Sequence, residues 1–233
     1  MAATTLMAIA AHPGDALFTM GAAVAQHIHN GGKGVFVSLT LGERGAPRGT
    51  PTGRYGQMQR DASEKAAKML GAELELLTYP DGEIPLRDET ALAVCDVIRR
   101  YKADAVITHW SGSWHKDHQN CFLVVRDAAF YASLATMQRK DEPHSVKRVF
   151  YADNWEDADN FKPDTYLDIT DVCDNWLRAC DEYPMWRGQT GFFRYNDYYS
   201  SLAIMRGCLS GFKRAAALMS DPSERVAKVR GLI

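Results

Sequence analysis

Several features that would assign this chain of 233 residues to other classes of protein are missing from it. No apolar run approaches the roughly 20 residues that a membrane helix needs, so we expect no membrane insertion. The N-terminus has neither a basic region nor a cleavage pattern, and we therefore expect no signal peptide. The formal net charge of -2 argues against binding of nucleic acid, because proteins of that class are usually basic.

Cysteine is also scarce and is not paired in the sequence. The chain has five cysteines, and none of them forms a C-x-x-C pair that would indicate a zinc ribbon or a redox dithiol. Cys173 and Cys180 could share a helix face, but seven residues of helix would put them roughly 10 Å apart, too far for a disulfide. We therefore expect a reduced, cytoplasmic protein.

What the sequence does contain is a regular alternation of strand-like and helix-like segments. We expect strands at residues 5–11, 35–39, 74–79, 105–108 and 148–151, and helices at residues 16–28, 55–70, 88–101, 119–133, 171–182 and 202–219. This order predicts the α/β class, as a Rossmann-like three-layer αβα sandwich with a mainly parallel sheet. We also expect a long loop at 42–55, leave 186–199 unassigned, and expect a single domain over residues 1–233, since no linker or repeat is apparent.

Two polar residues follow the first predicted strand. His12 and Asp15 lie three apart, on a turn that Pro13 fixes and for which Gly14 offers a backbone angle closed to most residues. Imidazole and carboxylate groups are both normal zinc ligands, so the pair could converge on one metal ion. The alternative is that Asp15 only caps the following helix and His12 is a hydrogen-bonded residue at a strand end.

A second polar stretch follows the strand at 105–108. It holds three of the seven histidines, His109, His115 and His118, together with Asp117. Since the carboxyl ends of parallel strands lie at one edge of a sheet, this stretch can face the first one across that edge. The sequence therefore favours a metal site built from both stretches.

Together the two stretches resemble the zinc-dependent deacetylases of the PIG-L/LmbE family (N-acetylglucosaminyl-phosphatidylinositol de-N-acetylase-like proteins). The segment Ala11-His12-Pro13-Gly14-Asp15-Ala16 resembles the family motif A-H-P-D-D-E, and His115-Lys116-Asp117-His118 resembles H-x-D-H. Leu39–Gly45 and Tyr79–Gly82 are also similar to family segments, and the resemblance spans roughly residues 5 to 210.

The resemblance implies a zinc ion held by His12, Asp15 and His118. It further implies a zinc-bound water that attacks the amide of an N-acylated, sugar-like small molecule, and His115 as the group that stabilises the oxyanion or protonates the leaving amine. Asp117 would be catalytic too, as a group that orients His115 or as a base. The same resemblance points to a homo-oligomer.

One departure from the family pattern concerns proton transfer. Where most of the family has an Asp that acts as general base, this chain has Gly14, which cannot take a proton. Losing a positioned base typically costs on the order of 10² to 10⁴-fold in rate. Asp117 or Glu43 could replace it, and we favour Asp117 because it lies in the metal-binding stretch.

Two other functions remain as alternatives. A non-catalytic or weakly active relative that binds metal and a ligand or partner is compatible with the missing base. A nucleotide-binding protein is disfavoured, because the first turn lacks the G-x-G-x-x-G pattern. His109, Trp110 and Trp114 could form a stacking wall for a flat substrate or belong to the core, and the sequence does not distinguish the two.

Overall fold

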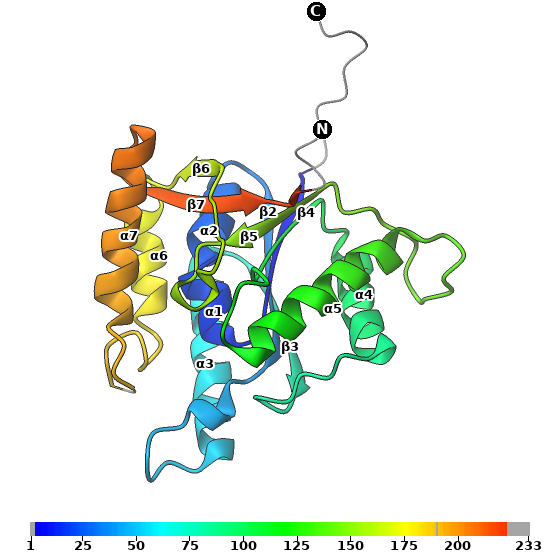
Figure 1. The fold of residues 1–233 in the computed structure, drawn as a ribbon, viewed down its shortest axis with the longest axis horizontal. Coiled ribbons are helices and arrows are strands. Elements are labelled where there is room, and N and C mark those ends of the chain that lie inside the picture. The colour runs from blue at the N-terminus through cyan, green and yellow to red at the C-terminus, as the bar shows by residue number, and fades with distance from the viewer. Residues whose placement is uncertain (1–2, 190, 223–233) are drawn as a thin grey trace, which may run out of the picture.

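The computed structural model describes residues 3–189 and 191–222, and these build one mixed sheet with helices on both faces (Figure 1). The strands are β1 (Thr5–Ala10), β2 (Lys33–Thr40), β3 (Glu73–Tyr79), β4 (Ala105–Thr108), β5 (Arg148–Ala152), β6 (Thr165–Asp168) and β7 (Ala215–Ser220). Their order across the sheet is β3-β2-β1-β4-β5-β7-β6. The strands β1 to β5 pair in parallel, while β7 runs antiparallel to both of its neighbours. The predicted Rossmann-like α/β sandwich with a mainly parallel sheet is confirmed.

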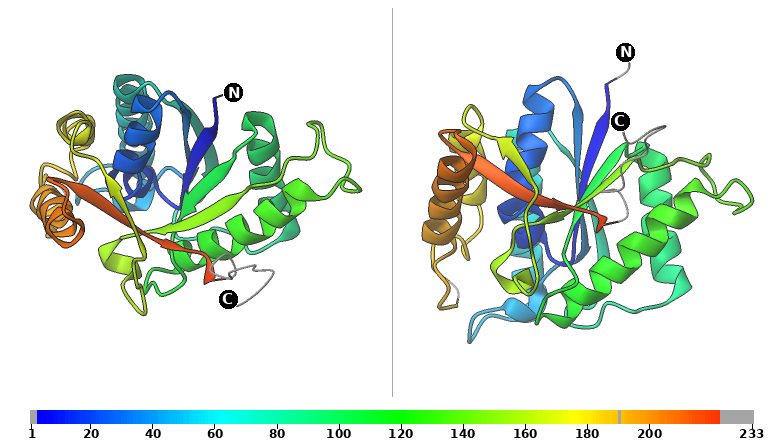
Figure 2. Two further views of the ribbon diagram at one scale, coloured as in Figure 1. Left: turned by 90° about the horizontal axis from the view of Figure 1, so that it is seen from above. Right: turned by 45° about the horizontal axis from the view of Figure 1, so that its top comes forward.

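The helices divide into two layers, one on each face of the sheet (Figures 1 and 2). They are α1 (Pro13–Phe18), α2 (Gly21–His29), α3 (Thr52–Leu70), α4 (Asp88–Tyr101), α5 (Lys116–Ser133), α6 (Cys173–Cys180) and α7 (Tyr195–Ser210), with short 3-10 turns η1 (Glu43–Gly45) and η2 (Trp155–Asp157). The helices α4 and α5 cover one face, and the other five cover the opposite face.

Strand β1 shows why the sheet is buried on both faces. Its six residues are all buried, as expected for a central parallel strand. Met7 and Ile9 belong to the core under α4 and α5, whereas Leu6 and Ala8 belong to the core on the other face. There are two cores because successive side chains of a strand point to opposite faces of the sheet.

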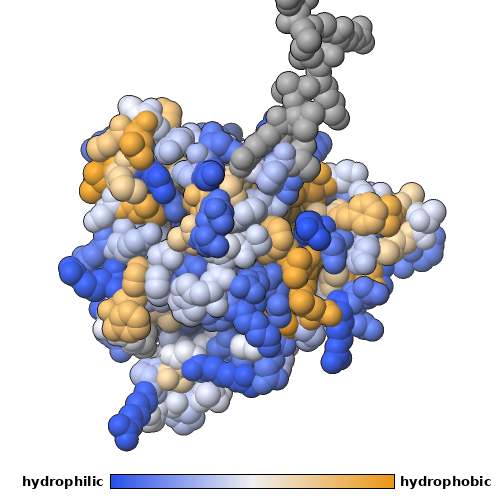
Figure 3. Space-filling model, viewed as in Figure 1, coloured by the Kyte–Doolittle hydropathy of each residue, from blue (hydrophilic) through white to orange (hydrophobic). Residues whose placement is uncertain are grey.

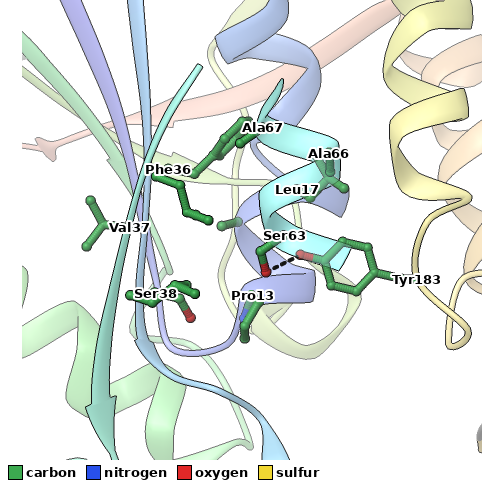
Figure 4. A pocket seen from close by; sticks show the side chains of 12 residues that line it. Pro13, Leu17, Phe36, Val37, Ser38, Ser63, Ala66, Ala67 and Tyr183 are labelled. Atoms are coloured by element: carbon green, nitrogen blue, oxygen red, sulfur yellow. Dashed lines mark hydrogen bonds between the residues drawn. The ribbon is translucent and has the colours of Figure 1, made fainter. Parts of the chain in front are cut away.

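Helix α1 is packed firmly against the sheet and its neighbours. Where α1, α3 and β2 meet, a gap of about 10 Å³ remains, beside which Ser63 Oγ and the Tyr183 hydroxyl lie 2.8 Å apart (Figure 4). A space of this size holds about one water at most, so it is a packing defect and not a binding site. The turn before α1 is therefore carried on a rigid support.

Two predicted helices are corrected at the N-terminal and C-terminal ends of the fold. The helix expected at 16–28 is two helices, and the first begins at Pro13, so Gly14 and Asp15 lie in its first turn and not in a preceding turn. Proline suits the first helical position, because its missing N–H needs no partner there. Gly14 does not have a positive φ, so the expected special backbone angle is wrong.

The helix expected at 202–219 is wrong in its second half. Helix α7 ends at Ser210, where Gly211 has a φ of 80°, and Ala215–Ser220 is strand β7. The alanines favour helix intrinsically, but pairing with β5 and β6 on both sides outweighs that preference. The strand β6 was not predicted either. In the segment left unassigned at 186–199, α7 begins at Tyr195.

Among the described residues, no helix is long and apolar enough to span a bilayer. On the face drawn in Figure 3, polar and apolar side chains are interspersed, with apolar ones gathered over α7 at the left and over α5 at the right. On α7, Ile204, Met205 and Leu209 are exposed. The long loop expected at 42–55 is interrupted by η1, and α3 begins within it at Thr52.

Candidate functional site

The candidate site lies where the sheet order reverses, at the carboxyl ends of β1 and β4. The chain leaves these adjacent strands toward opposite faces, and such a point is where open α/β sheets leave a crevice. His12 follows β1, His109 follows β4, and α5 begins just after His115. The ends of β3 and β5 add Asp81 and Asp157.

Asp157 joins two of the histidines below the crevice. Its Oδ1 lies 2.8 Å from His118 Nδ1 and its Oδ2 lies 2.8 Å from His109 Nδ1, with all three side chains fully buried. On the other side of the His109 ring, Nε2 accepts a hydrogen bond from the backbone N–H of Ala11 at 3.1 Å. Both nitrogens of His109 are therefore occupied, and His109 has a structural role.

His118 differs from His109 at its second nitrogen. Its Nε2 is buried and has no hydrogen-bond partner among the described residues. Asp15 Oδ2 is 3.1 Å away, but its direction does not make a hydrogen bond with the ring. A buried unpaired polar atom is costly, so this nitrogen points to a missing ligand. Burial lowers the pKa of His118, but Asp15 and Asp157 outweigh it and raise that pKa to about 10.

His12 lies on the opposite side of Asp15. Its Nδ1 is 2.9 Å from Asp15 Oδ2, and its Nε2 is 3.0 Å from Asp81 Oδ1. Burial would lower the pKa of His12, but the carboxylates of Asp117, Asp15 and Asp81 raise it well above its usual value. Asp15 Oδ2 thus lies between His12 and His118, so the three predicted metal ligands are brought together.

Three overlapping groups of side chains have potential ligand atoms within 4.8 Å of one another among the described residues. The groups are His12, His115 and His118; Asp15, His109 and His118; and His12, Asp81 and Asp117. The nitrogen and oxygen donors are those that zinc and similar divalent ions prefer. His109 already uses both of its nitrogens. The remaining donors, together with the unpaired Nε2 of His118, fit a divalent metal ion.

His115 caps the N-terminus of α5 with its side chain. Its Nδ1 accepts a hydrogen bond at 3.2 Å from the backbone N–H of Asp117, so in the neutral ring Nε2 carries the proton. Burial and the charges of His118 and His12 lower the pKa of His115 to about 4. At neutral pH, His115 is therefore an uncharged hydrogen-bond donor at the cavity wall.

Asp117 is fully buried behind His12. Its carboxylate accepts hydrogen bonds from the backbone N–H groups of Gly82 at 2.7 Å and Ile84 at 3.4 Å. The same carboxylate lies 3.6 Å from His12 Nε2. The hydrogen bond between Asp117 and His115 uses the backbone of Asp117 and not its side chain. The Asp117 side chain therefore holds the 82–84 turn and faces His12.

A cavity of about 360 Å³ opens in front of these groups. Glu156 lies on its wall, with Oε2 3.5 Å from His118 Nε2, and burial together with the charge of Asp15 raises its pKa to about 7. Gln59 lines the same cavity, and its buried Oε1 has no hydrogen-bond partner among the described residues. The cavity thus offers a carboxyl group and an amide oxygen that a substrate can engage.

Gly14 also lines the cavity, beside the ring of Phe18. A Cβ placed on Gly14 would lie 3.1 Å from Phe18 Cε2, closer than most real contacts of this kind. The other suggested base, Glu43, accepts a hydrogen bond from the backbone N–H of Asp81 at 2.9 Å. Glu43 thus helps to hold the turn that carries Asp81.

The three residues of the suggested stacking wall have different environments. His109 is buried beside Asp157, and Trp110 donates a hydrogen bond to the carbonyl of Asp159 while packing on Tyr151. Trp114 alone is largely exposed, at 66%. The stacking interpretation therefore applies to Trp114 and not to the other two.

Sequence reasoning missed Asp157 and Glu156 and gave Asp81 no role. The available signal was the acidic stretch directly after the predicted strand at 148–151, and the turn after the strand at 74–79. Polar residues at the carboxyl ends of parallel strands are candidates for a site wherever they occur.

The family model for PIG-L (GlcNAc-PI de-N-acetylase) matches residues 7–129, which is more than half of the chain. The chain belongs to the PIG-L family. Among curated relatives, it is 26% identical to the diacetylchitobiose deacetylase of Thermococcus kodakarensis, over 93% of this chain and 83% of that protein. It is also 26% identical to the 4-oxalmesaconate hydratase of Pseudomonas putida, over 86% of this chain and 79% of that protein.

Solved structures agree with this membership at the level of the fold. The 4-carboxy-2-hydroxymuconate hydratase from Pseudomonas putida superimposes with a TM-score of 0.86 at 21% identity, covering 99% of both chains. The N,N'-diacetylchitobiose deacetylase from Pyrococcus horikoshii gives a TM-score of 0.80 at 19% identity, covering 96% of this chain and 85% of that one. The PIG-L fold thus carries both deacetylases and a hydratase.

Proposed function

We propose that this PIG-L protein is a zinc-dependent amidohydrolase that removes the acyl group from an N-acylated, sugar-like small molecule. The observation that carries the proposal is His118 Nε2, a buried nitrogen without a hydrogen-bond partner that faces Asp15. Family membership and the similarity to a diacetylchitobiose deacetylase support an amide as the bond that is cleaved. The five cysteines, all free, support a reduced and cytoplasmic location.

His12, Asp15 and His118 would hold the metal ion. When bound, such an ion supplies a Lewis acid that lowers the pKa of water and polarises an amide carbonyl. Asp157 keeps the proton of the neutral His118 ring on Nδ1, so that Nε2 presents its lone pair to the crevice. Asp117 faces His12 from the other side and fixes the turn that carries Asp81.

His115 would stabilise the negative charge that develops on the carbonyl oxygen. Its Nδ1 is held by the backbone, so its Nε2–H donates into the cavity. Because its pKa is lowered to about 4, it enters the reaction uncharged, as a donor whose position is fixed. This arrangement favours oxyanion stabilisation over protonation of the leaving amine.

Two carboxylates compete for the proton-accepting role that Gly14 cannot fill. Asp117 accepts two backbone hydrogen bonds and is fully buried, which favours a positioning role. Glu156 lies on the cavity wall, with Oε2 3.5 Å from His118 Nε2. We favour Glu156 as the base and Asp117 as the group that positions His12.

The decisive experiment is acetate release from a panel of N-acetylated amino sugars by protein stripped of metal and then loaded with zinc. Turnover should depend on zinc and should be lost in His118→Ala, while the exposed His29→Ala serves as the matched control. Glu156→Gln should lower kcat about 10²-fold or more. Asp117→Asn should weaken zinc binding more than it lowers kcat of the fully loaded enzyme.

A hydratase is the second candidate function, because a hydratase relative is as similar in sequence as the deacetylase. It would use the same activated water to add across a carbon–carbon double bond of an unsaturated carboxylic acid. Loss of the conjugated absorbance of such an acid, with no acetate release from any amide, would select this function. A protein that binds zinc stoichiometrically and turns over neither class of compound would instead be the non-catalytic relative.

A further inference from the structure

We call the cavity of about 360 Å³ at the candidate site the catalytic cavity. A second hollow of about 300 Å³ adjoins it. The two share four lining residues, Gly45, Glu156, Met185 and Tyr195, so they form one continuous groove. We name the second hollow the aromatic cleft, because its remaining walls are Trp114, Trp155, Gly191, Phe192 and Phe193. A substrate bound at the metal site can therefore extend into the aromatic cleft without leaving the protein.

The wall of the aromatic cleft is built from stacked rings. Trp155 and Phe193 lie face to face, with ring centroids 4.1 Å apart and an interplanar angle of 11°. Trp114 lies 5.8 Å from Trp155 and is tilted by 60° to it. At the rim, Trp114 and Phe192 are 66% and 91% exposed. Large exposed aromatic side chains beside a reaction cavity are unfavourable unless something covers them.

The residues that line the aromatic cleft indicate which kind of ligand group it can bind. Among the described residues that line the aromatic cleft, only Glu156 carries a charge. It lies at the junction with the catalytic cavity. A sugar ring can stack its C–H face on an indole ring, but its hydroxyl groups also need several hydrogen-bond partners, and the aromatic cleft offers few. An alkyl chain or an aromatic ring needs none and gains from burial against the rings.

We propose that the aromatic cleft binds an apolar group of the substrate, joined to the amide whose carbonyl sits at the metal site. The proposal rests on the proposed function, because it takes the catalytic cavity as the place of the amide. The apolar group can lie on the acyl side or on the amine side of that amide. Because the aromatic cleft contributes to binding, we expect the protein to prefer a substrate larger than a simple N-acetyl sugar.

The test is calorimetric binding to zinc-loaded protein, which needs no turnover. One arm uses acetate, butanoate, hexanoate and octanoate, whose carboxylate can take the metal site and whose chain probes the acyl side. The other arm compares N-acetylglucosamine with its hexyl and phenyl glycosides, which probe the amine side. In one of the two arms, affinity should rise about fourfold per added methylene, as a contribution of roughly 0.8 kcal/mol per buried CH₂ requires.

Substitutions locate the effect. Trp114→Ala should reduce the gain to about twofold per methylene, and Trp114→Phe should restore most of it. The matched control is Phe130→Ala, another exposed aromatic residue, which lies on α5 outside the groove and should leave the gain unchanged. Octanoate or the phenyl glycoside should exclude water from Trp114 and shift the tryptophan emission to shorter wavelength, and this shift should disappear in Trp114→Ala.

The outcomes separate this proposal from the proposed function. Chain-length dependence without amide hydrolysis would support the aromatic cleft and count against the hydrolase. Amide hydrolysis with no chain-length dependence in either arm would overturn the aromatic cleft alone. A dependence that is the same in Trp114→Ala as in the unmodified protein would overturn it as well, because the probe would then bind elsewhere.

Discussion

Asp157 Oδ1 lies 2.8 Å from Nδ1 of His118. A carboxylate in this position makes the ring donate from Nδ1, which leaves the lone pair on Nε2 for a metal ion when the ring is neutral. The same contact fixes the orientation of the ring toward Asp15. The candidate metal site is therefore organised as much by Asp157 as by the residues that would bind the ion.

The first prediction concerns Asp157 directly. Asp157→Asn keeps the shape of the side chain but removes its charge, so zinc affinity should fall about 10- to 100-fold. Competition with a chelator of known affinity measures the change. The control is Asp159→Asn, two residues along the chain, which should bind zinc like the unmodified protein. If Asp157→Asn binds zinc as tightly as the unmodified protein, Asp157 does not support metal binding.

The location of the candidate site could be predicted from the sequence, but the contacts that its supporting residues make could not. His12 and His118 stand directly after or near segments with clear strand patterns, and the geometry of parallel strands brings such ends together. Asp157 lies 39 residues from His118 in the sequence. The contact depends on β5 being the neighbour of β4, which no local pattern specifies.

The fold shows the same division between local and long-range information. The parallel half of the sheet has strong local patterns and was predicted strand by strand. The antiparallel edge was not, because Ala215–Ser220 has helix-forming residues and becomes a strand only through pairing with β5 and β6. Long-range pairing outweighed intrinsic propensity there.

The second prediction concerns Arg99, a charged residue that is 2% exposed. Its guanidinium donates to five backbone carbonyls, those of Tyr131, Ala132, Leu134, Met137 and Asp141. Arg99→Met removes all five of these hydrogen bonds, although the carbonyls of Tyr131, Ala132 and Leu134 keep a backbone N–H donor. It should lower the free energy of unfolding by about 3 kcal/mol or more. Chemical denaturation measures the loss.

The neighbouring Arg100 provides the control for that experiment. Its side chain is half exposed and pairs with Glu75 at 3.0 Å. Exposed ion pairs contribute little, so Arg100→Met should change the free energy of unfolding by about 1 kcal/mol or less. If the two substitutions cost the same, the carbonyl cluster around Arg99 does not stabilise the fold as inferred.

The third prediction is that metal binding releases protons. The pKa of His118 is raised to about 10, so its ring is protonated at neutral pH in the metal-free protein, and the pKa of His12 is raised as well. A metal ion needs the unprotonated nitrogen, so zinc affinity should increase as the pH rises. Calorimetry in two buffers of different ionisation enthalpy should show about one proton or more released per zinc.

The stability of the metal-free protein should depend on pH in the opposite direction to zinc affinity. The folded-state pKa of His118 lies above its ordinary value of 6.5, so its stabilising contribution is complete below pH 6.5 and is lost as the pH rises through about 10. His115, with a pKa lowered to about 4, stays neutral over this range and contributes no proton. Identical heats of zinc binding in the two buffers would contradict the prediction.

The last prediction concerns Gly14, where most of the family carries the general base. Gly14→Asp would put a carboxylate back on the cavity wall, in the first turn of α1, where a negative charge is favourable. The backbone is no obstacle, because Gly14 does not have a positive φ. The obstacle is Phe18, whose Cε2 would lie 3.1 Å from the new Cβ and whose ring packs against Trp186 and Tyr195.

This geometry predicts a graded result. Gly14→Ala should lower stability without changing turnover, since it adds the contact with Phe18 but no base. Gly14→Asp should raise the release of acetate from simple N-acetylated sugars, and Gly14→Asp combined with Phe18→Leu should raise it further, by about 10-fold or more in kcat. If the double variant folds, binds zinc stoichiometrically and shows no gain, the missing base does not limit the reaction. That result would favour Glu156 as a base already in place, because a second carboxylate would then add nothing to proton transfer.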